Sequence, residues 1–162
     1  MVYWKWGKRE RSLNQTKEGE IIMISTKGRY AIRVMIDLAE NEHGGYIPLK
    51  DIAERQGISK KYLEIIMKDM VSAELVTGAS GKGGGYKLSR PAEEYTIGDI
   101  LEVMEGSLSP VACLANKNYE CDRKDICKTL PMWAEYDKMI HDFFNSKKLT
   151  DLVGQYLSSW VI

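Results

Sequence analysis

The chain has few cysteines and no long hydrophobic run. None of its apolar segments approaches the roughly 20 residues that a membrane-spanning helix needs. No charged start followed by an apolar stretch and a small-residue cleavage site marks an export signal. The three cysteines are an odd number within residues 113–127, whereas secreted disulfide frameworks use even numbers spread over the chain. We therefore expect a cytoplasmic protein, without a membrane partner, whose cysteines are reduced thiols or metal ligands.

The sequence also lacks the motifs of common enzyme classes. It has no Cys-x-x-Cys pair, no dinucleotide-binding glycine loop and no grouping of histidine with carboxylates. The glycine-rich segment 78–88 (GASGKGGGYKL) does not end in Gly-Lys-Ser/Thr and lacks a strand–loop–helix context, so it does not fit a nucleotide phosphate loop. We expect no enzymatic activity.

Net charge is absent too, because 23 basic residues balance 23 acidic ones, but the charges are unevenly distributed. Residues 1–22 carry a net charge of +2, residues 23–91 of +3 and residues 92–162 of −5. A basic front and an acidic rear are typical of a chain whose front half meets a polyanion. Chance clustering would give the same totals, so charge alone leaves both interpretations open.

Three helices are predicted in the basic half. Apolar residues recur at helical spacing over 26–39, which indicates an amphipathic helix. A second helix is expected over 49–56, because Pro48 suits a helix start and Gly57 a helix end. A third is expected over 60–74. Two helices joined by a short turn that contains glycine match the helix-turn-helix unit.

The third helix has two distinct faces, and Ser59 is a good N-cap for it. The inward face comprises Tyr62, Leu63, Ile66, Met67 and Met70, and the opposite face comprises Lys61, Glu64, Ile65 and Lys68. In a DNA major groove, Ile65 could meet a thymine methyl while Lys61 and Glu64 address base edges or phosphates. Single exposed isoleucines are common, so an ordinary solvated face is the alternative.

Two short extended pieces then flank a glycine-dense tip that carries Lys82. Glycines let a backbone approach a ligand closely, and a lysine at a tip can reach phosphate or a minor groove. Helix, helix-turn-helix and glycine-tipped hairpin, in this order, predict a winged helix-turn-helix DNA-binding domain over residues 23–91. The predicted fold class is mainly α with a small β-hairpin wing.

The acidic half is predicted to hold a linker helix over 96–106 and an irregular cysteine-bearing loop over 107–129. A long helix follows from Pro131, so residues 92–130 form the sensor region and 131–162 the dimerisation helix and tail. The apolar residues that predict a coiled-coil seam on this helix are Trp133, Tyr136, Ile140 and Phe143. An intramolecular core stripe is the alternative.

Residues 1–22 show no helical or strand periodicity. The segment KEGE at 17–20 would be encoded almost wholly by purines shortly before the Met23 codon, where a bacterial ribosome-binding site belongs. We therefore expect translation to start at Met23 and the first 22 residues to be a non-native or disordered extension. A genuine basic arm is the alternative.

Cys113, Cys121 and Cys127 lie in one loop between two helices. Thiolates are soft ligands that select zinc, copper(I) or iron–sulfur clusters. Zinc loops usually bring close-set pairs, whereas a cluster tolerates the wider gaps seen here. Spacing alone thus leaves a cluster, zinc, redox thiols and ordinary cysteines open.

Four segments keep the order of one family's motifs: MISTKGRYA at 23–31, IAERQGIS at 52–59, YLE at 62–64 and GGGYKL at 83–88. Together they closely resemble the Rrf-two (Rrf2) family of bacterial transcription regulators. The resemblance implies a homodimeric winged-helix regulator in which a long helix pairs the subunits. Cluster-binding branches carry three cysteines in the loop before that helix, which implies an iron–sulfur cluster (2Fe-2S or 4Fe-4S) on Cys113, Cys121 and Cys127.

The implied partner is double-stranded DNA with a palindromic operator. The candidate DNA-binding residues are Lys27, Arg29, Ser59, Lys60, Lys61, Glu64, Ile65, Lys68, Ser80 and Lys82. The implied function is transcription regulation that senses iron–sulfur, iron, nitric oxide or redox status through the cluster. A cluster-free regulator of the same fold, controlled by thiol oxidation or a protein partner, is the alternative.

Two positions and one spacing depart from IscR-like members of the family. Leu130 stands where those members carry a histidine, Ser80 stands where their wing carries an arginine, and the first two cysteines are further apart. The signal and the fourth cluster ligand are therefore not assigned, and His141 is interpreted as a packed or surface residue.

Overall fold

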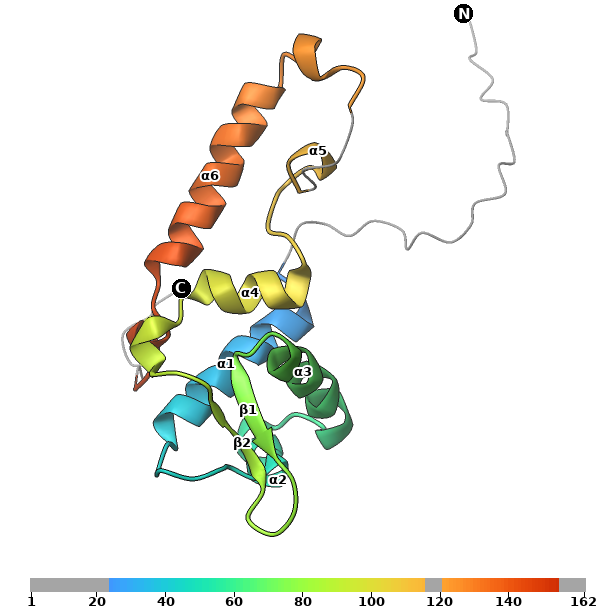
Figure 1. Cartoon of the computed structure of the whole chain (residues 1–162). Helices are drawn as coiled ribbons and strands as arrows, with labels where there is room; N and C mark the ends of the chain where they lie inside the picture. Colours follow the sequence, from blue (N-terminus) through green and yellow to red (C-terminus); the bar gives the residue numbers. More distant parts are fainter. Residues whose placement is uncertain (1–23, 116–120, 155–162) are drawn as a thin grey trace, which may run out of the picture.

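The computed structural model describes residues 24–115 and 121–154 as a small head from which one long helix extends (Figure 1). The helices are α1 (Thr26–Glu40), α2 (Leu49–Gln56), α3 (Lys60–Ser72), α4 (Ile97–Glu105), α5 (Ala112–Ala115) and α6 (Leu130–Ser146). The strands are β1 (Val76–Ala79) and β2 (Gly85–Leu88), and the short 3-10 helices are η1 (Ala92–Glu94), η2 (Lys124–Ile126) and η3 (Leu149–Asp151). This order confirms the predicted winged helix-turn-helix fold. The predicted extension 1–22 lies outside the described residues. Within the two described ranges, no helix combines the length and apolar character that a membrane span requires.

Local signals in the sequence set the ends of the head helices. Ser25 caps α1, and Pro48 occupies the position before the first residue of α2. Gly57 ends α2 in the left-handed conformation, at a φ of 62°. Ser59 then caps α3, where its hydroxyl accepts a hydrogen bond of 3.3 Å from Tyr62 N. The predicted helix-turn-helix is confirmed.

The end of α3 differs from the prediction, because the helix stops at Ser72 and not at Glu74. Glu74 has a φ of 57° and is the one non-glycine residue with a positive φ in the described part of the chain. Leu75 N donates back to Met70 O at 2.9 Å, which closes the helix end. This left-handed turn, which apolar periodicity does not reveal, directs the chain into β1.

The wing is an antiparallel hairpin with Val76 opposite Leu88 and Ala79 opposite Gly85. A third extended segment joins it, since Ile47 and Tyr86 exchange two backbone hydrogen bonds of 2.8 Å. Gly85 is required there: a Cβ at this position would lie 2.2 Å from the carbonyl oxygen of Ile47. The wing is thus anchored to the segment that precedes α2.

The core lies where α1, α3 and α4 meet (Figure 1). Its fully buried apolar residues include Ala31, Val34, Met35, Leu63, Ile66, Met67, Met70, Ile100 and Leu101. Gly28 lies buried where α1 meets α4: a Cβ there would lie 3.1 Å from Leu101 Cδ2 and would displace the Glu105 carboxylate. On its other side α4 packs against α6, and Ile97 N donates to Lys147 O at 2.8 Å. The long helix is therefore joined to the head through α4.

The sequence predicts an irregular loop over residues 107–129, but this cysteine-bearing segment contains short helices. It contains α5 and η2, and α6 begins at Leu130, with Pro131 in its first turn. The run Ala112–Ala115 consists mainly of good helix formers, which suits one short helical turn.

The predicted seam on α6 divides into two stripes. Ile140 packs against the core together with Phe144, whereas Tyr136 and Phe143 are exposed. Successive residues of an α-helix turn by about 100°, so a 3-4-3 spacing can mix neighbouring stripes. Met132, Tyr136, Met139 and Phe143 share the exposed stripe, with exposed fractions of 54, 46, 61 and 56%. Ile140 is half-buried against the core, as the alternative of an intramolecular core stripe predicts for this residue, and the seam itself stays a prediction.

Candidate nucleic-acid interface and cysteine loop

The two faces of α3 are as predicted. Leu63, Ile66, Met67 and Met70 are fully buried, while Lys60, Lys61, Glu64, Ile65 and Lys68 are exposed. Ile65 is 50% exposed although it lies on a helix whose other isoleucine is buried. None of the charged residues on this face forms an ion pair within residues 24–115 and 121–154. The face presents cations, one carboxylate and an apolar group to solvent.

The wing tip is a second exposed group of candidates. Ser80 and Lys82 lie in the loop between β1 and β2, and both are exposed. The loop projects from the head at the end remote from α6 (Figure 1). Gly81 and Gly83 have φ values of 92° and 79°, which glycine adopts readily. The wing tip is therefore a tight turn that carries the long, positively charged side chain of Lys82.

The two candidates on α1 have different surroundings. Lys27 is partly buried, and its Nζ lies 2.5 Å from Asp69 Oδ2 on α3. Arg29 is exposed, and its Nη2 donates to Thr26 Oγ1 at 3.0 Å. The Lys27 charge thus joins α1 to α3, whereas Arg29 forms no ion pair with any described residue.

All three candidate metal ligands are free thiols and partly exposed. Cys113 lies on α5, and Cys127 follows η2 just before α6. In the described part of the chain, no three histidine, cysteine or carboxylate side chains are grouped closely enough to hold a metal ion. The structure therefore does not gather the cysteines. The donor set still fits a cluster by its chemistry, because three unpaired, solvent-reachable sulfurs are soft ligands for iron.

Cys127 has a distinct environment. Its Sγ lies 3.5 Å from Thr129 Oγ1, and this contact is the main reason why the pKa of the thiol is lowered. A lower pKa increases the thiolate fraction at neutral pH, and the thiolate is the form that binds metals and reacts with oxidants.

His141 contacts other groups. Its Nε2 lies 3.5 Å from Glu102 Oε1 on α4, and its Nδ1 lies 2.8 Å from the backbone oxygen of Asp137. His141 is thus half-buried between α4 and its own helix, its interpretation as a packed or surface residue stays a prediction, and the fourth cluster ligand stays unassigned. Leu130, at the position where IscR-like members carry a histidine, is the first residue of α6 and offers no donor atom.

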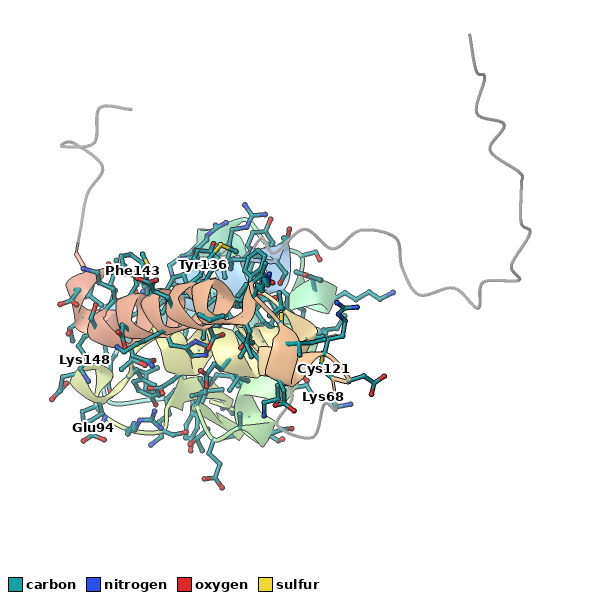
Figure 2. The ribbon with its side chains drawn as sticks, turned by 90° about the horizontal axis from the view of Figure 1, so that it is seen from above. Lys68, Glu94, Cys121, Tyr136, Phe143 and Lys148 are labelled. Atoms are coloured by element: carbon teal, nitrogen blue, oxygen red, sulfur yellow. The ribbon has the colours of Figure 1, made fainter. Side chains whose placement is uncertain are left out.

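The exposed apolar stripe lies on the long helix, away from the core. Figure 2 shows Tyr136 and Phe143 on the same side of α6, with Cys121 beyond the N-terminal end of the helix. Four large apolar side chains at coiled-coil spacing on an exposed face are typical of a protein–protein contact. Sequence spacing identified two members of this stripe and missed Met132 and Met139.

A glycine-tipped hairpin beside an N-capped, cation-bearing helix of a helix-turn-helix unit defines a winged-helix DNA-binding protein. Comparison with known proteins identifies the particular group. The profile of the Rrf2 family, described as iron-dependent transcriptional regulators, matches residues 24–155. The chain belongs to this family: it is a transcription regulator and not an enzyme.

Comparison with individual proteins supports the same family. The regulator IscR of Pectobacterium carotovorum is 36% identical over 131 residues, which cover 81% of this chain and 79% of the relative. Protein rrf2 of Nitratidesulfovibrio vulgaris is 35% identical over 130 residues, which cover 80% of this chain and 86% of the relative.

Solved structures share the fold. CymR, the global cysteine regulator of B. subtilis, aligns with a TM-score of 0.64 and 34% identity over 82% of this chain and 96% of its own. T. potens IscR aligns with a TM-score of 0.63 and 33% identity over 80% of this chain and 85% of its own.

Proposed function

We propose that this regulator is a homodimer that binds a palindromic operator and senses iron–sulfur, iron, nitric oxide or redox status through a cluster on Cys113, Cys121 and Cys127. The DNA-binding residues we propose are Lys27, Arg29, Ser59, Lys60, Lys61, Glu64, Ile65, Lys68, Ser80 and Lys82. In this proposal α3 enters the major groove, the wing tip meets the backbone or minor groove, and α6 pairs the subunits.

The exposed face of α3 carries the DNA-binding part of the proposal. Lys61, Glu64 and Ile65 stand side by side on the first two turns of a helix that Ser59 caps. A lysine can address guanine or phosphate, a glutamate can accept from cytosine N4, and an isoleucine can contact a thymine methyl. The mixture of these groups supports sequence-selective binding, since a purely cationic face would bind all DNA alike.

The exposed stripe on α6 supports the homodimer. Met139 and Phe143 are more than half exposed, at 61 and 56%. Two copies that pair through this stripe would give a two-fold axis, which a palindromic operator mirrors. The recognition helices would then have to lie about one helical turn of DNA apart, ~34–36 Å.

The chemistry of the cysteine segment and the names of the relatives support the cluster. The matching family profile is described as iron-dependent, and the relatives include IscR regulators. When bound, a cluster supplies a redox-responsive cross-link. Cys113 would hold it from α5, Cys121 from the segment before η2, and Cys127 from the residue that directly follows η2.

A second candidate function has its own support. The thiols are free, and Cys127 has a lowered pKa because of its contact with Thr129. CymR, one of the structural relatives, is also known as an oxidised crystal form from Staphylococcus aureus, 33% identical to this chain. A cluster-free regulator that responds to thiol oxidation would use the same residues differently.

Anaerobic purification separates these two candidates. Cluster-bound protein should be brown, with absorbance near about 400 nm and with iron and acid-labile sulfide in equal amounts. Colourless protein that binds its operator with full affinity would favour the thiol-based alternative.

The DNA-binding proposal is tested by selecting bound sequences from random DNA, with and without cluster. Glu64→Ala or Ile65→Ala should change which bases are selected, because each lost base contact removes about 1–3 kcal/mol of discrimination between the right base and a wrong one. An unchanged selected sequence with both variants would show that this face of α3 does not lie in the groove.

A further inference from the structure

Asp37 is a charged residue in the core of the head. Its side chain is only 2% exposed, and it lies on the face of α1 that also buries Val34 and Leu38. Within the described ranges it is the one polar or charged residue classed as buried. A carboxylate in such a place is unfavourable unless it is paired and hydrogen-bonded.

Its partners are the last two residues of α2. Arg55 Nε donates to Asp37 Oδ1 at 2.9 Å and Arg55 Nη2 donates to Oδ2 at 2.7 Å, which makes a two-pronged pair. Gln56 Nε2 adds a third hydrogen bond to Oδ1 at 2.9 Å. The hydrogen bond with Asp37 raises the pKa of Arg55, so the arginine stays charged at every physiological pH. Both carboxylate oxygens are therefore satisfied by one helix end.

Arg33 extends the same network to α3. Its Nε donates to Gln56 Oε1 at 3.1 Å, and its Nη2 donates to the backbone oxygen of Gln56. The guanidinium also lies over the ring of Tyr30, 5.2 Å from the centroid. That ring in turn meets Tyr62 of α3 edge-on, with centroids 5.8 Å apart. Two residues of α1, Arg33 and Asp37, therefore both hold the end of α2.

This network lies next to the turn that leads from α2 into α3, so it can affect the position of α3. Gln56 is the last residue of α2, and only residues 57–59 separate it from the first residue of α3. The middle of that turn is buried Ile58, and its last residue is the cap Ser59. A rotation of the α2 end would therefore move the N-terminal turn of α3, which carries Lys60 and Lys61. Apolar contacts allow small rotations, whereas a two-pronged ion pair permits one arrangement.

We propose that Asp37 is a positioning residue for operator recognition: through Arg55 and Gln56 it sets the angle at which α3 is presented to DNA, without touching DNA itself. The inference rests on the proposed function, because it concerns how the same helix reads its operator. It predicts that loss of the carboxylate charge lowers selectivity more than it lowers general DNA affinity.

The test compares three variants on two duplexes, the operator selected by the wild-type protein and a random sequence of equal length. Asp37→Asn keeps the size of the side chain and removes the charge. Glu54→Gln removes one negative charge from an exposed residue near the end of α2, and is the matched control. Gln56→Met removes two hydrogen bonds of the network without any change in charge. Circular dichroism at the assay temperature establishes that each variant is folded.

Asp37→Asn should lower the ratio of operator affinity to random-DNA affinity by about tenfold, with the same salt dependence on random DNA as Glu54→Gln. Gln56→Met should also lower this affinity ratio, by a smaller factor. If Asp37→Asn does not fold, the ratio measured for Gln56→Met tests the proposal by itself. Equal ratios for wild type, Gln56→Met and every folded Asp37→Asn sample would overturn the proposal. Wild-type protein that selects no sequence at all would refute the proposed function before any variant is compared.

Discussion

Tyr95 Oη donates a hydrogen bond of 2.7 Å to the carbonyl oxygen of Leu75, at the point where α3 leads into β1. The same hydroxyl accepts hydrogen bonds of 3.0 Å from Ser89 N and Arg90 N, where β2 ends. Tyr95 is fully buried and directly precedes the capping residue of α4. One side chain therefore joins both roots of the wing to the helix that supports α6.

Tyr95→Phe should lower the free energy of unfolding by about 1–3 kcal/mol, because buried backbone groups lose their partner while the ring is kept. Urea unfolding followed by circular dichroism measures the change. Tyr46→Phe is the matched control, since Tyr46 is partly exposed and its ring contact with Lys87 would persist. Equal stability of the two variants would mean that water replaces the Tyr95 hydroxyl.

Glu74 should be replaceable by glycine with a gain in stability. Its φ of 57° strains a residue with a Cβ, and a Cβ in this conformation costs about 1 kcal/mol. We expect Glu74→Gly to raise the free energy of unfolding by about 0.5–1 kcal/mol. The neighbouring Ala73→Gly, at a φ of −93°, should give no gain. A loss of stability in Glu74→Gly would show that the glutamate side chain compensates its own strain.

The helix ends of the head could be predicted from the sequence, whereas the contacts of Tyr95 could not. Pro48, Gly57 and Ser59 act on the backbone next to them, so local reasoning placed the helix-turn-helix correctly. Tyr95 contacts Leu75, which lies 20 residues earlier in the chain, so no local sequence pattern predicts this contact.

The same distinction applies to α6 and to Asp37. Which stripe of α6 is exposed depends on how the helix is rotated against α4, and the 3-4-3 spacing fits either stripe. Asp37 gave a weak signal, namely a carboxylate within an apolar helical face. Its partners on α2 follow only from the packing of two helices.

Lys82→Ala should weaken binding to all DNA sequences to a similar degree. The side chain stands on an exposed loop tip, so its expected partner is a phosphate, which carries no sequence information. The slope of log K against log salt should decrease by about 0.9 for one lost phosphate contact. Lys138→Ala is the control, because this exposed lysine lies on α6 and pairs with Asp142. A changed base preference in Lys82→Ala would instead place the wing against base edges.

Thr129→Val should make Cys127 less reactive near neutral pH. The Thr129 hydroxyl contributes most to the lowered pKa of this thiol, so its removal should raise that pKa and decrease the thiolate fraction at pH 7. Alkylation of metal-free protein by iodoacetamide, followed by mass spectrometry of each cysteine peptide from pH 6 to 9, measures the rate. The midpoint for Cys127 should move to higher pH, and Cys113 serves as the internal control. An unmoved midpoint would show that another group sets the pKa of Cys127.

Met139→Glu should convert the proposed dimer into monomers without unfolding the head. Met139 is 61% exposed and belongs to the stripe with Tyr136 and Phe143, so a charge there opposes burial between two helices but disturbs no core contact. We expect the dissociation constant of the dimer to rise by about a hundredfold or more, as measured by analytical ultracentrifugation.

Ala134→Glu is the matched control, because this exposed residue lies two positions after Met132, about 200° around the helix axis, and receives the same charge. The two variants should also differ on DNA. A monomer reads one half-site as well as the wild type does, whereas only a dimer holds two recognition helices at the spacing of a full site. Met139→Glu should therefore lose its preference for full over half sites, and Ala134→Glu should keep it. A dimeric Met139→Glu with intact full-site binding would place the subunit contact elsewhere on the molecule.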